Sequence, residues 1–283
     1  MAAQIVLVLL FFPVVSSHMK VVDLTWTHGP STIYWPGSVG FNFTNVAEVE
    51  TIHYRYESNW FSTPEHGGTH LDSPSHFFEG GWKADEIPAE RLIGPGVILD
   101  VTSQAKADPD YRVTQADFEA YESKHGRIPH GAIVIMNSGW GARYSDKKRF
   151  FNTEYPDNSS TFHFPGYHED AITWLVVNRN VSMVGVDTPS NDYGQSTVFP
   201  SHVILAKNNI PGLENVARLN QVPAKGATVI VGSIKLFSGS GGPARILATW
   251  DTHGKPDCTS GCMNILETAS TSLFAVLVVV SVI

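Results

Sequence analysis

The stretch His66-Gly-Gly-Thr-His70-Leu-Asp72-Ser-Pro-Ser-His76 holds three histidines and one aspartate within eleven residues, all at even positions. Histidine nitrogens and carboxylate oxygens are the usual ligands of zinc, and they also suit manganese and iron. Unrelated surface or core histidines are common, but they rarely gather so densely. The stretch therefore predicts a metal site.

The backbone of this stretch is predicted to be extended rather than helical. His66 and His70 have the i, i+4 spacing of a zincin helix, but the glutamate that follows the first zincin histidine is absent. Gly67-Gly68 and Pro74 also oppose a helix. Residues i and i+2 of a strand point to the same face, so His70 and Asp72 should project side by side. The two glycines would let the chain bend so that His66 joins them.

Three protein ligands from this stretch would leave open positions at the metal, as in catalytic rather than structural sites. His76 could be a fourth ligand or a general acid–base beside the metal, and the sequence leaves both roles open. His202 and Glu214, twelve residues apart, are the distant candidates to complete the ligand set. On spacing alone this distant pair is a weak signal, because 12 histidines and 27 acidic residues produce such pairs easily.

Composition describes an ordinary globular protein. The 283 residues are 42% apolar and 16% charged, and the formal net charge is −8 at pH 7. Without a run of lysine or arginine, this charge argues against nucleic-acid binding. The stretch between Met19 and Trp250 shows no linker or internal repeat, so we expect one domain, spanning residues 18–257.

The N-terminus predicts secretion. An apolar run from Ile5 to Val15 ends at Ser16-Ser17, so residues 1–17 read as a signal peptide, although no basic residue precedes the run. The run is too short to span a bilayer, which needs about 20 residues. Three N-glycosylation sequons agree with a secreted glycoprotein: Asn42-Phe-Thr44, Asn158-Ser-Ser160 and Asn180-Val-Ser182.

The C-terminus predicts a lipid anchor. Small residues at Ser260-Gly261-Cys262, a polar spacer and the apolar tail Leu273–Ile283 follow one another as in a GPI-attachment signal, here assigned to residues 258–283. Cleavage after Ser260 would separate Cys258 from Cys262, so a disulfide between them would not survive processing. The expected mature protein is extracellular and touches the membrane only through lipid. A tail anchor or a packed C-terminal strand is the alternative.

Hydrophobic periodicity places regular elements around the histidine stretch. Phe41–Phe61 reads as a hairpin that leads into it, and a helix is expected from N-cap Thr114 to Lys124. A second helix is expected over His168–Asn178, and Arg143–Ser160 reads as an exposed polar excursion. Strands are expected at Met19–Thr25, Gly96–Val101, Ala132–Met136, Val181–Val186, Ala227–Val231 and Ala244–Ala248.

Other catalytic motifs find no support. The glycine-rich Ser238–Pro243 lacks the P-loop lysine and reads as a tight turn. No Gly-x-Ser-x-Gly elbow is present and both cysteines lie near the C-terminus, so serine or cysteine nucleophilic catalysis is not expected.

The motif His66-x-Gly-Thr-His70-x-Asp72-x-Pro-x-His76-Phe77 resembles the signature of the cyclase family, which includes bacterial kynurenine formamidase and isatin hydrolase. The resemblance extends from Val22 to about Ala248. Further matching segments are Trp35-Pro-Gly37, Gly185-Val-Asp-Thr-Pro-Ser190, His202 to Leu213-Glu-Asn215, and Gly242-Pro-Ala-Arg-Ile246.

This resemblance implies an α/β fold: a single compact mixed α/β barrel-like domain of the cyclase (swivelling β/β/α) type, usually dimeric. It implies one metal held by His66, His70 and Asp72, with Asp72 bridging to a second metal. His202 and Glu214 would hold that second ion. In an alternative arrangement, Glu214 would be shared between the two ions. Both second-site groups are present, which favours two zinc ions per chain over a single manganese.

The resemblance also implies roles and substrates. His76 would be the acid–base residue, and Trp35 would contact an aromatic amide. The expected reaction is arylformamidase-like, converting N-formylkynurenine to kynurenine and formate as in tryptophan catabolism. Isatin hydrolase-like or lactone hydrolysis is the alternative, and a non-catalytic cell-surface metal-containing binding protein is a further one. The signal, sequons and lipid tail are foreign to a cytosolic tryptophan-degrading enzyme and leave the physiological substrate open.

Overall fold

The computed structural model describes residues 19–252, of which Val21–Trp250 form one compact unit. This unit lies within the predicted domain of residues 18–257. The predicted signal peptide, the GPI-attachment signal, Cys258 and Cys262 lie outside the described residues. No helix between residues 19 and 252 is long and apolar enough to cross a membrane.

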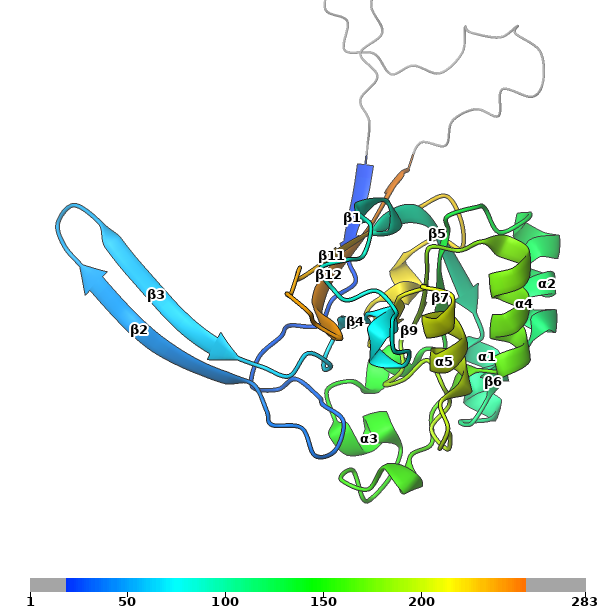
Figure 1. The fold of residues 1–283 in the computed structure, drawn as a ribbon, viewed down its shortest axis with the longest axis horizontal. Coiled ribbons are helices and arrows are strands. Elements are labelled where there is room, and N and C mark those ends of the chain that lie inside the picture. Colours follow the sequence, from blue (N-terminus) through cyan, green and yellow to red (C-terminus); the bar gives the residue numbers. More distant parts are fainter. Residues whose placement is uncertain (1–18, 253–283) are drawn as a thin grey trace, which may run out of the picture. The chain divides into compact units, whose positions relative to one another are not determined.

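Seven strands close into a mixed barrel (Figure 1). Closure occurs at β4, which pairs antiparallel with both β10 and β12. An additional strand, β1 (Met19–Asp23), lies next to β12 in the sheet order. Around the barrel the strands are β12 (Gly241–Asp251), β11 (Thr228–Ser233), β5 (Ile93–Asp100), β7 (Ile133–Asn137), β9 (Met183–Val186), β10 (Gly212–Glu214) and β4 (His70–Asp72).

Helices cover the parallel part of the barrel, where β5, β7, β9 and β10 run side by side. Parallel neighbours need long crossover connections, which the helices provide. Side chains on β7 alternate: Ile133 and Ile135 join the barrel core, whereas Val134 and Met136 pack in the cluster that includes helix residues. The helices are α1 (Thr102–Ala107), α2 (Gln115–His125), α4 (Glu169–Arg179) and α5 (Pro200–Lys207). The predicted α/β barrel-like class is confirmed.

Local sequence signals placed most of these elements correctly. The Asp117 carboxylate accepts a hydrogen bond from the Thr114 backbone N–H at 2.7 Å and caps α2 as expected. The predicted hairpin is present as β2 (Asn42–Glu50) and β3 (Arg55–Ser62). A further small sheet pairs β6 (Arg112–Val113) with β8 (Gly166–Tyr167).

The expectation of an exposed excursion over Arg143–Ser160 is wrong for its central part. The segment contains α3 (Lys147–Phe151), and three of its four aromatic side chains are buried, with Tyr144 6% exposed, Phe150 0% and Phe151 1%. They belong to an aromatic cluster on which Trp35 packs. Charged residues stand next to these aromatic residues in the sequence. The average hydrophobicity of the segment is therefore low, and it predicts an exposed loop.

Candidate metal centre and active site

Strand β4 carries the middle of the histidine stretch into the barrel wall. The pairing of β4 with β10 sets Glu214 opposite His70, so two residues far apart in the sequence become neighbours. Gly68 has a left-handed backbone (φ +58°), and a side chain at Gly67 would collide with the Tyr34 ring. The two glycines therefore make the predicted bend.

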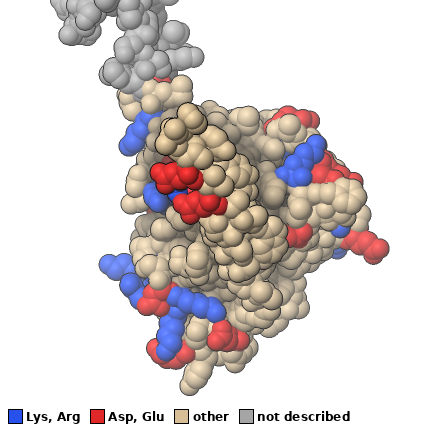
Figure 2. All heavy atoms as spheres, turned by 90° about the vertical axis from the view of Figure 1, so that its left-hand side faces the viewer, with Lys and Arg blue, Asp and Glu red and all other residues tan. Residues whose placement is uncertain are grey.

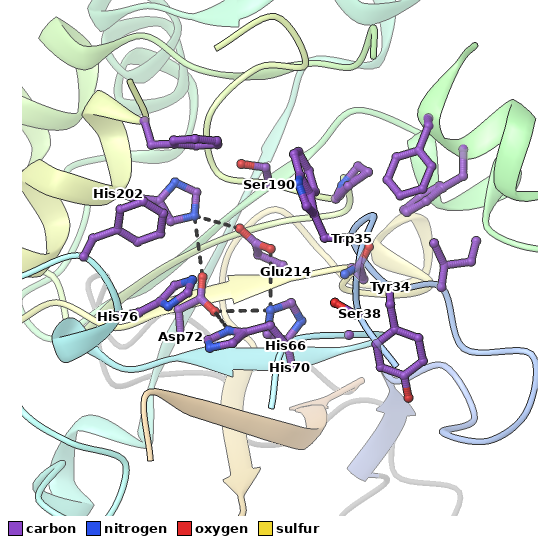
Figure 3. A pocket seen from close by; sticks show the side chains of 18 residues that line it. Tyr34, Trp35, Ser38, His66, His70, Asp72, His76, Ser190, His202 and Glu214 are labelled. Carbon is purple, nitrogen blue, oxygen red and sulfur yellow. Dashed lines mark hydrogen bonds and ion pairs between the residues drawn. The ribbon is translucent and has the colours of Figure 1, made fainter. Parts of the chain in front are cut away.

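Asp72 lies at the centre of the cluster, and its two oxygens face different histidines (Figure 3). Oδ1 lies 2.6 Å from His66 Nδ1 and 3.2 Å from His70 Nε2, whereas Oδ2 lies 3.5 Å from His202 Nε2. Glu214 lies between the same two groups, with Oε2 3.5 Å from His70 Nε2 and Oε1 2.9 Å from His202 Nε2. All five predicted ligand residues therefore meet at one point, with a shared carboxylate between them.

The charges of this cluster call for a cation. Burial alone would lower the pKa of His70, but the carboxylates of Asp72 and Glu214 outweigh it and raise that pKa to about 9. Burial would likewise lower the pKa of His202, yet hydrogen bonds with Asp192, Asp72 and Glu214 raise it well above its ordinary value. Burial would raise the pKa of Asp72, but His70 and the neighbouring histidines hold it well below its usual range.

In the metal-free protein, protons on buried histidines would balance these carboxylates. A divalent cation among the same nitrogen and oxygen atoms would replace that positive charge. The donor set of imidazoles and carboxylates matches what zinc or manganese accepts. The residues present therefore fit a metal.

Partners behind the histidines orient their rings. His70 Nδ1 lies 2.9 Å from the Gly68 carbonyl oxygen, and His202 Nδ1 lies 2.6 Å from Asp192 Oδ2. With its proton on Nδ1, each ring keeps a free lone pair on Nε2 that can bind a metal ion. Both Nε2 atoms face the carboxylates of the cluster. The sequence analysis missed Asp192, because nothing in the local pattern links it to His202.

His76 stacks on His66, with ring centroids 3.8 Å apart and an interplanar angle of 18°. His66, Asp72 and His76 each offer one potential metal-ligand atom, and these three atoms lie within 4.8 Å of one another. The geometry is therefore compatible with both predicted roles of His76, as a fourth ligand and as an acid–base residue. Partial desolvation by the neighbouring side chains lowers the pKa of His76 to about 4, although the residue keeps an exposed face toward the cavity. Its imidazole is therefore neutral at physiological pH and able to accept a proton.

A cavity of about 330 Å³ opens over the metal ligands. Trp35, the predicted substrate contact, lines it and is held edge-on against Phe151 and Phe162 at centroid distances of 6.2 and 5.2 Å. The other aromatic walls were not predicted from the sequence; they are Tyr34, Phe77, Phe150, Phe151 and Phe199. The volume and the aromatic walls suit a small flat molecule.

Comparison with known proteins finds relatives over most of the chain. The Cyclase family model matches residues 22–193. An isatin hydrolase of Roseibium aggregatum is 34% identical over 266 residues, covering 88% of this chain and 98% of that protein. A kynurenine formamidase of Salinibacter ruber is 26% identical over 227 residues, covering 80% and 96%. The solved structure of isatin hydrolase A from Ralstonia solanacearum has a TM-score of 0.74 at 32% identity, covering 82% of this chain and 92% of that one.

Proposed function

The chain belongs to the cyclase family, and on this premise we propose that it is a metal-dependent hydrolase of small aryl or cyclic amides. The observation that carries the proposal is the placement of Asp72, whose two oxygens face His70 and His202 beneath an aromatic cavity. A non-catalytic binding protein would need the metal ligands but would not need His76 beside the open cavity.

Two ions per chain, zinc by preference and manganese as the alternative, would be held by this cluster. His66, His70 and Asp72 would hold one, and Asp72, His202 and Glu214 the other. A divalent ion held there supplies Lewis acidity, which lowers the pKa of water and polarises an amide carbonyl.

The protein's own residues do the rest. Trp35 and the aromatic walls take the ring of the substrate and exclude water from the cavity. This orientation presents the amide carbonyl to the ligand cluster and its nitrogen to His76. The neutral His76 imidazole takes a proton from the attacking water and returns it to the leaving nitrogen.

Three substrate types are candidates. The arylformamidase-like reaction, N-formylkynurenine to kynurenine and formate, has support from the family signature and the kynurenine formamidase relative. Ring opening of a cyclic amide such as isatin has support from the isatin hydrolase relatives, which match more of this chain at higher identity. A lactone is the remaining candidate. Turnover of these compounds by purified protein, before and after chelation, separates them; bound metal without turnover of any would favour the binding protein.

We propose that this activity is displayed at the outer cell surface through a GPI anchor, on the strength of the terminal sequences and the three sequons. Treatment of intact cells with a phosphatidylinositol-specific phospholipase should release the protein. Retention on the cells after treatment would contradict the anchor without affecting the assigned chemistry.

A further inference from the structure

The glycine-rich segment 238–243 lies against His66, the first of the predicted metal ligands. A Cβ at Gly241 would lie 2.6 Å from His66 Cε1, so the absence of a side chain there makes room for the imidazole ring. Ser240, one residue earlier, places its Oγ 2.9 Å from His66 Nε2. The Ser240 carbonyl oxygen accepts a hydrogen bond from the Ser73 backbone N–H at 2.8 Å, which fixes this part of the segment beside the ligand stretch. The segment therefore holds a hydroxyl group against one ring nitrogen of a metal ligand.

Glu65 holds Ser240 from the other side. Glu65 Oε2 accepts a hydrogen bond from the Ser240 backbone N–H at 3.0 Å and a second one from the Ser240 hydroxyl. The same oxygen lies 3.8 Å from His66 Nε2, which is too far for a hydrogen bond. The three residues therefore form a hydrogen-bonded series in which Ser240 stands between the carboxylate and the imidazole ring.

This contact sets Glu65 apart from acidic side chains that only balance surface charge. On the face of the molecule that Figure 2 shows, acidic and basic side chains lie beside one another at several places. Arg55–Glu48 and Lys147–Asp157 are pairs of this kind, each with a nitrogen–oxygen distance of 2.8 Å. Within residues 19–252, no lysine or arginine forms such an ion pair with Glu65, whose Oε2 atom is directed at the glycine-rich segment instead. Its carboxylate therefore belongs to the surroundings of the metal ligands.

The direction of these hydrogen bonds follows from the number of protons. A hydroxyl group has one proton to donate, and an ionised carboxylate only accepts. The Ser240 proton therefore goes to Glu65, so Ser240 Oγ accepts from His66 Nε2–H. With its proton on Nε2, the ring can keep a lone pair on Nδ1, and Nδ1 is the atom that lies 2.6 Å from Asp72 Oδ1 in the ligand cluster. His66 thus offers Nδ1 to a metal ion, whereas the two other histidine ligands offer Nε2.

We propose that Ser240 and Glu65 are positioning residues for the metal ion bound by His66: together they keep its proton on Nε2 and its Nδ1 turned toward the ion. This role rests on the proposed function, in which metal ions occupy the cluster. His66 needs such partners more than the other histidine ligands, because its side chain is 25% exposed, against 4% for His70 and 7% for His202. Looser packing leaves the ring freer to turn or to move its proton to the other nitrogen, and either change withdraws the lone pair from the ion.

Loss of these partners should weaken metal binding and leave the rest of the site in place. An imidazole ring that turns over about its Cβ–Cγ bond keeps its plane, so the stack of His66 on His76, with 3.8 Å between centroids, would remain. The aromatic walls of the cavity, among them Trp35, come from other parts of the chain. The expected defect is therefore one that added zinc corrects, unlike the loss of His76 itself.

Zinc titration of the purified, metal-free protein against a competing chelator tests this role. Ser240→Ala removes the hydroxyl. Glu65→Ala leaves that hydroxyl free to donate to His66 Nε2, which favours the tautomer with its proton on Nδ1. Both substitutions should weaken one of the bound ions by about 10- to 100-fold, the usual effect of removing an outer partner of a ligand.

Conservative and control variants separate this effect from a general disturbance. Ser240→Thr keeps a hydroxyl and Glu65→Gln keeps an accepting oxygen, so both should bind zinc as the unsubstituted protein does. Ser238→Ala is the matched control, because Ser238 belongs to the same segment but is held by Asp85 through its backbone N–H at 3.0 Å. Its zinc affinity should also equal that of the unsubstituted protein.

Turnover at different zinc concentrations separates positioning from a merely structural role. Ser240→Ala should turn over isatin or N-formylkynurenine slowly at low zinc and recover as zinc is raised, which a misshaped site would not do. Zinc affinity unaltered in both Ser240→Ala and Glu65→Ala would overturn the proposal, as would an equal loss of affinity in Ser238→Ala. If Ser240→Ala misfolds, the comparison of Glu65→Ala with Glu65→Gln replaces it. Zinc binding without turnover in the unsubstituted protein would count against the proposed function alone, and the zinc affinities of the variants would still decide the role of Ser240.

Discussion

Replacement of Asp192 by asparagine should weaken metal binding although Asp192 is not itself a ligand. The buried Asp192 carboxylate accepts hydrogen bonds from His202 Nδ1 at 2.6 Å and from the Ser201 backbone N–H at 2.9 Å. Asparagine has one oxygen and one NH₂ group. If the amide oxygen accepts from the Ser201 N–H, the NH₂ group points at His202 Nδ1. It then favours the tautomer whose proton is on Nε2, the atom that must bind the metal.

In that orientation the NH₂ also meets the His202 backbone N–H, which lies 3.2 Å from the same carboxylate oxygen in the unsubstituted protein. If the amide turns over, its NH₂ meets the Ser201 N–H instead, so one buried backbone donor is unpaired in either orientation. Such a group costs about 1–3 kcal/mol. Because about 1.4 kcal/mol corresponds to a tenfold change in an equilibrium constant, the affinity for zinc should fall by about 10- to 100-fold, the usual effect of removing an outer partner. Titration with zinc against a competing chelator measures this change.

Asp110→Asn is the matched control. Asp110 Oδ2 lies 2.7 Å from His163 Nδ1, the same pairing of side chains, but neither residue lines the cavity. This substitution should leave zinc affinity unchanged. Equal zinc affinity of Asp192→Asn and the unsubstituted protein would refute the reasoning, because it would mean that the His202 ring needs no partner to present Nε2.

Three further predictions concern other parts of the chain. His76→Ala should keep its metal content and lose about 10²–10⁴-fold in kcat, as expected for an acid–base residue; a lost metal ion would instead identify His76 as a ligand. Phe199 has a left-handed backbone (φ 47°) at the start of α5, so Phe199→Gly should be more stable than Phe199→Ala by about 1 kcal/mol, while both raise the KM. Equal melting temperatures would show that the conformation is not strained. The hydrogen bond from Arg179 lowers the pKa of Glu122, so its stabilising effect is present above the unfolded-state pKa and disappears as the pH falls through the folded-state value. Glu122→Gln should therefore lower the melting temperature at neutral pH and approach the unsubstituted protein in acid; a gap that persists at every pH would contradict this.

The parts of the fold and site that follow from local periodicity could be predicted from the sequence. His70 and Asp72 share a face because strand parity is a property of neighbouring residues, and the two glycines indicate the bend that brings in His66. The meeting of His202 and Glu214 with this stretch does not follow from local periodicity. Their approach depends on the packing of α5 and β10 around the barrel, so their spacing was only a weak signal and the family signature was needed to connect them firmly to the histidine stretch.

The features that the sequence analysis missed have no local signal. Phe150 and Phe151 lie among lysines and arginines, so an average over the segment reads as solvent-exposed although one face of α3 is buried. Asp192 becomes relevant only when its loop meets α5. The glycine-rich segment was predicted to be a tight turn, and the backbone does turn at Phe237 and Ser238, but Gly241 and Gly242 begin β12 and pair with β4. A side chain at Gly241 would meet the Leu71 carbonyl oxygen at 2.5 Å, so glycine permits this pairing.

The metal content of the purified protein, measured together with its turnover, tests the central claim most directly. The shared position of Asp72 predicts two ions per chain, one of which should be lost in Glu214→Gln. Turnover of N-formylkynurenine or isatin should vanish on chelation and return with zinc. A single ion per chain would contradict the bridging role of Asp72, and turnover that survives complete removal of metal would contradict the assignment as a metal-dependent hydrolase.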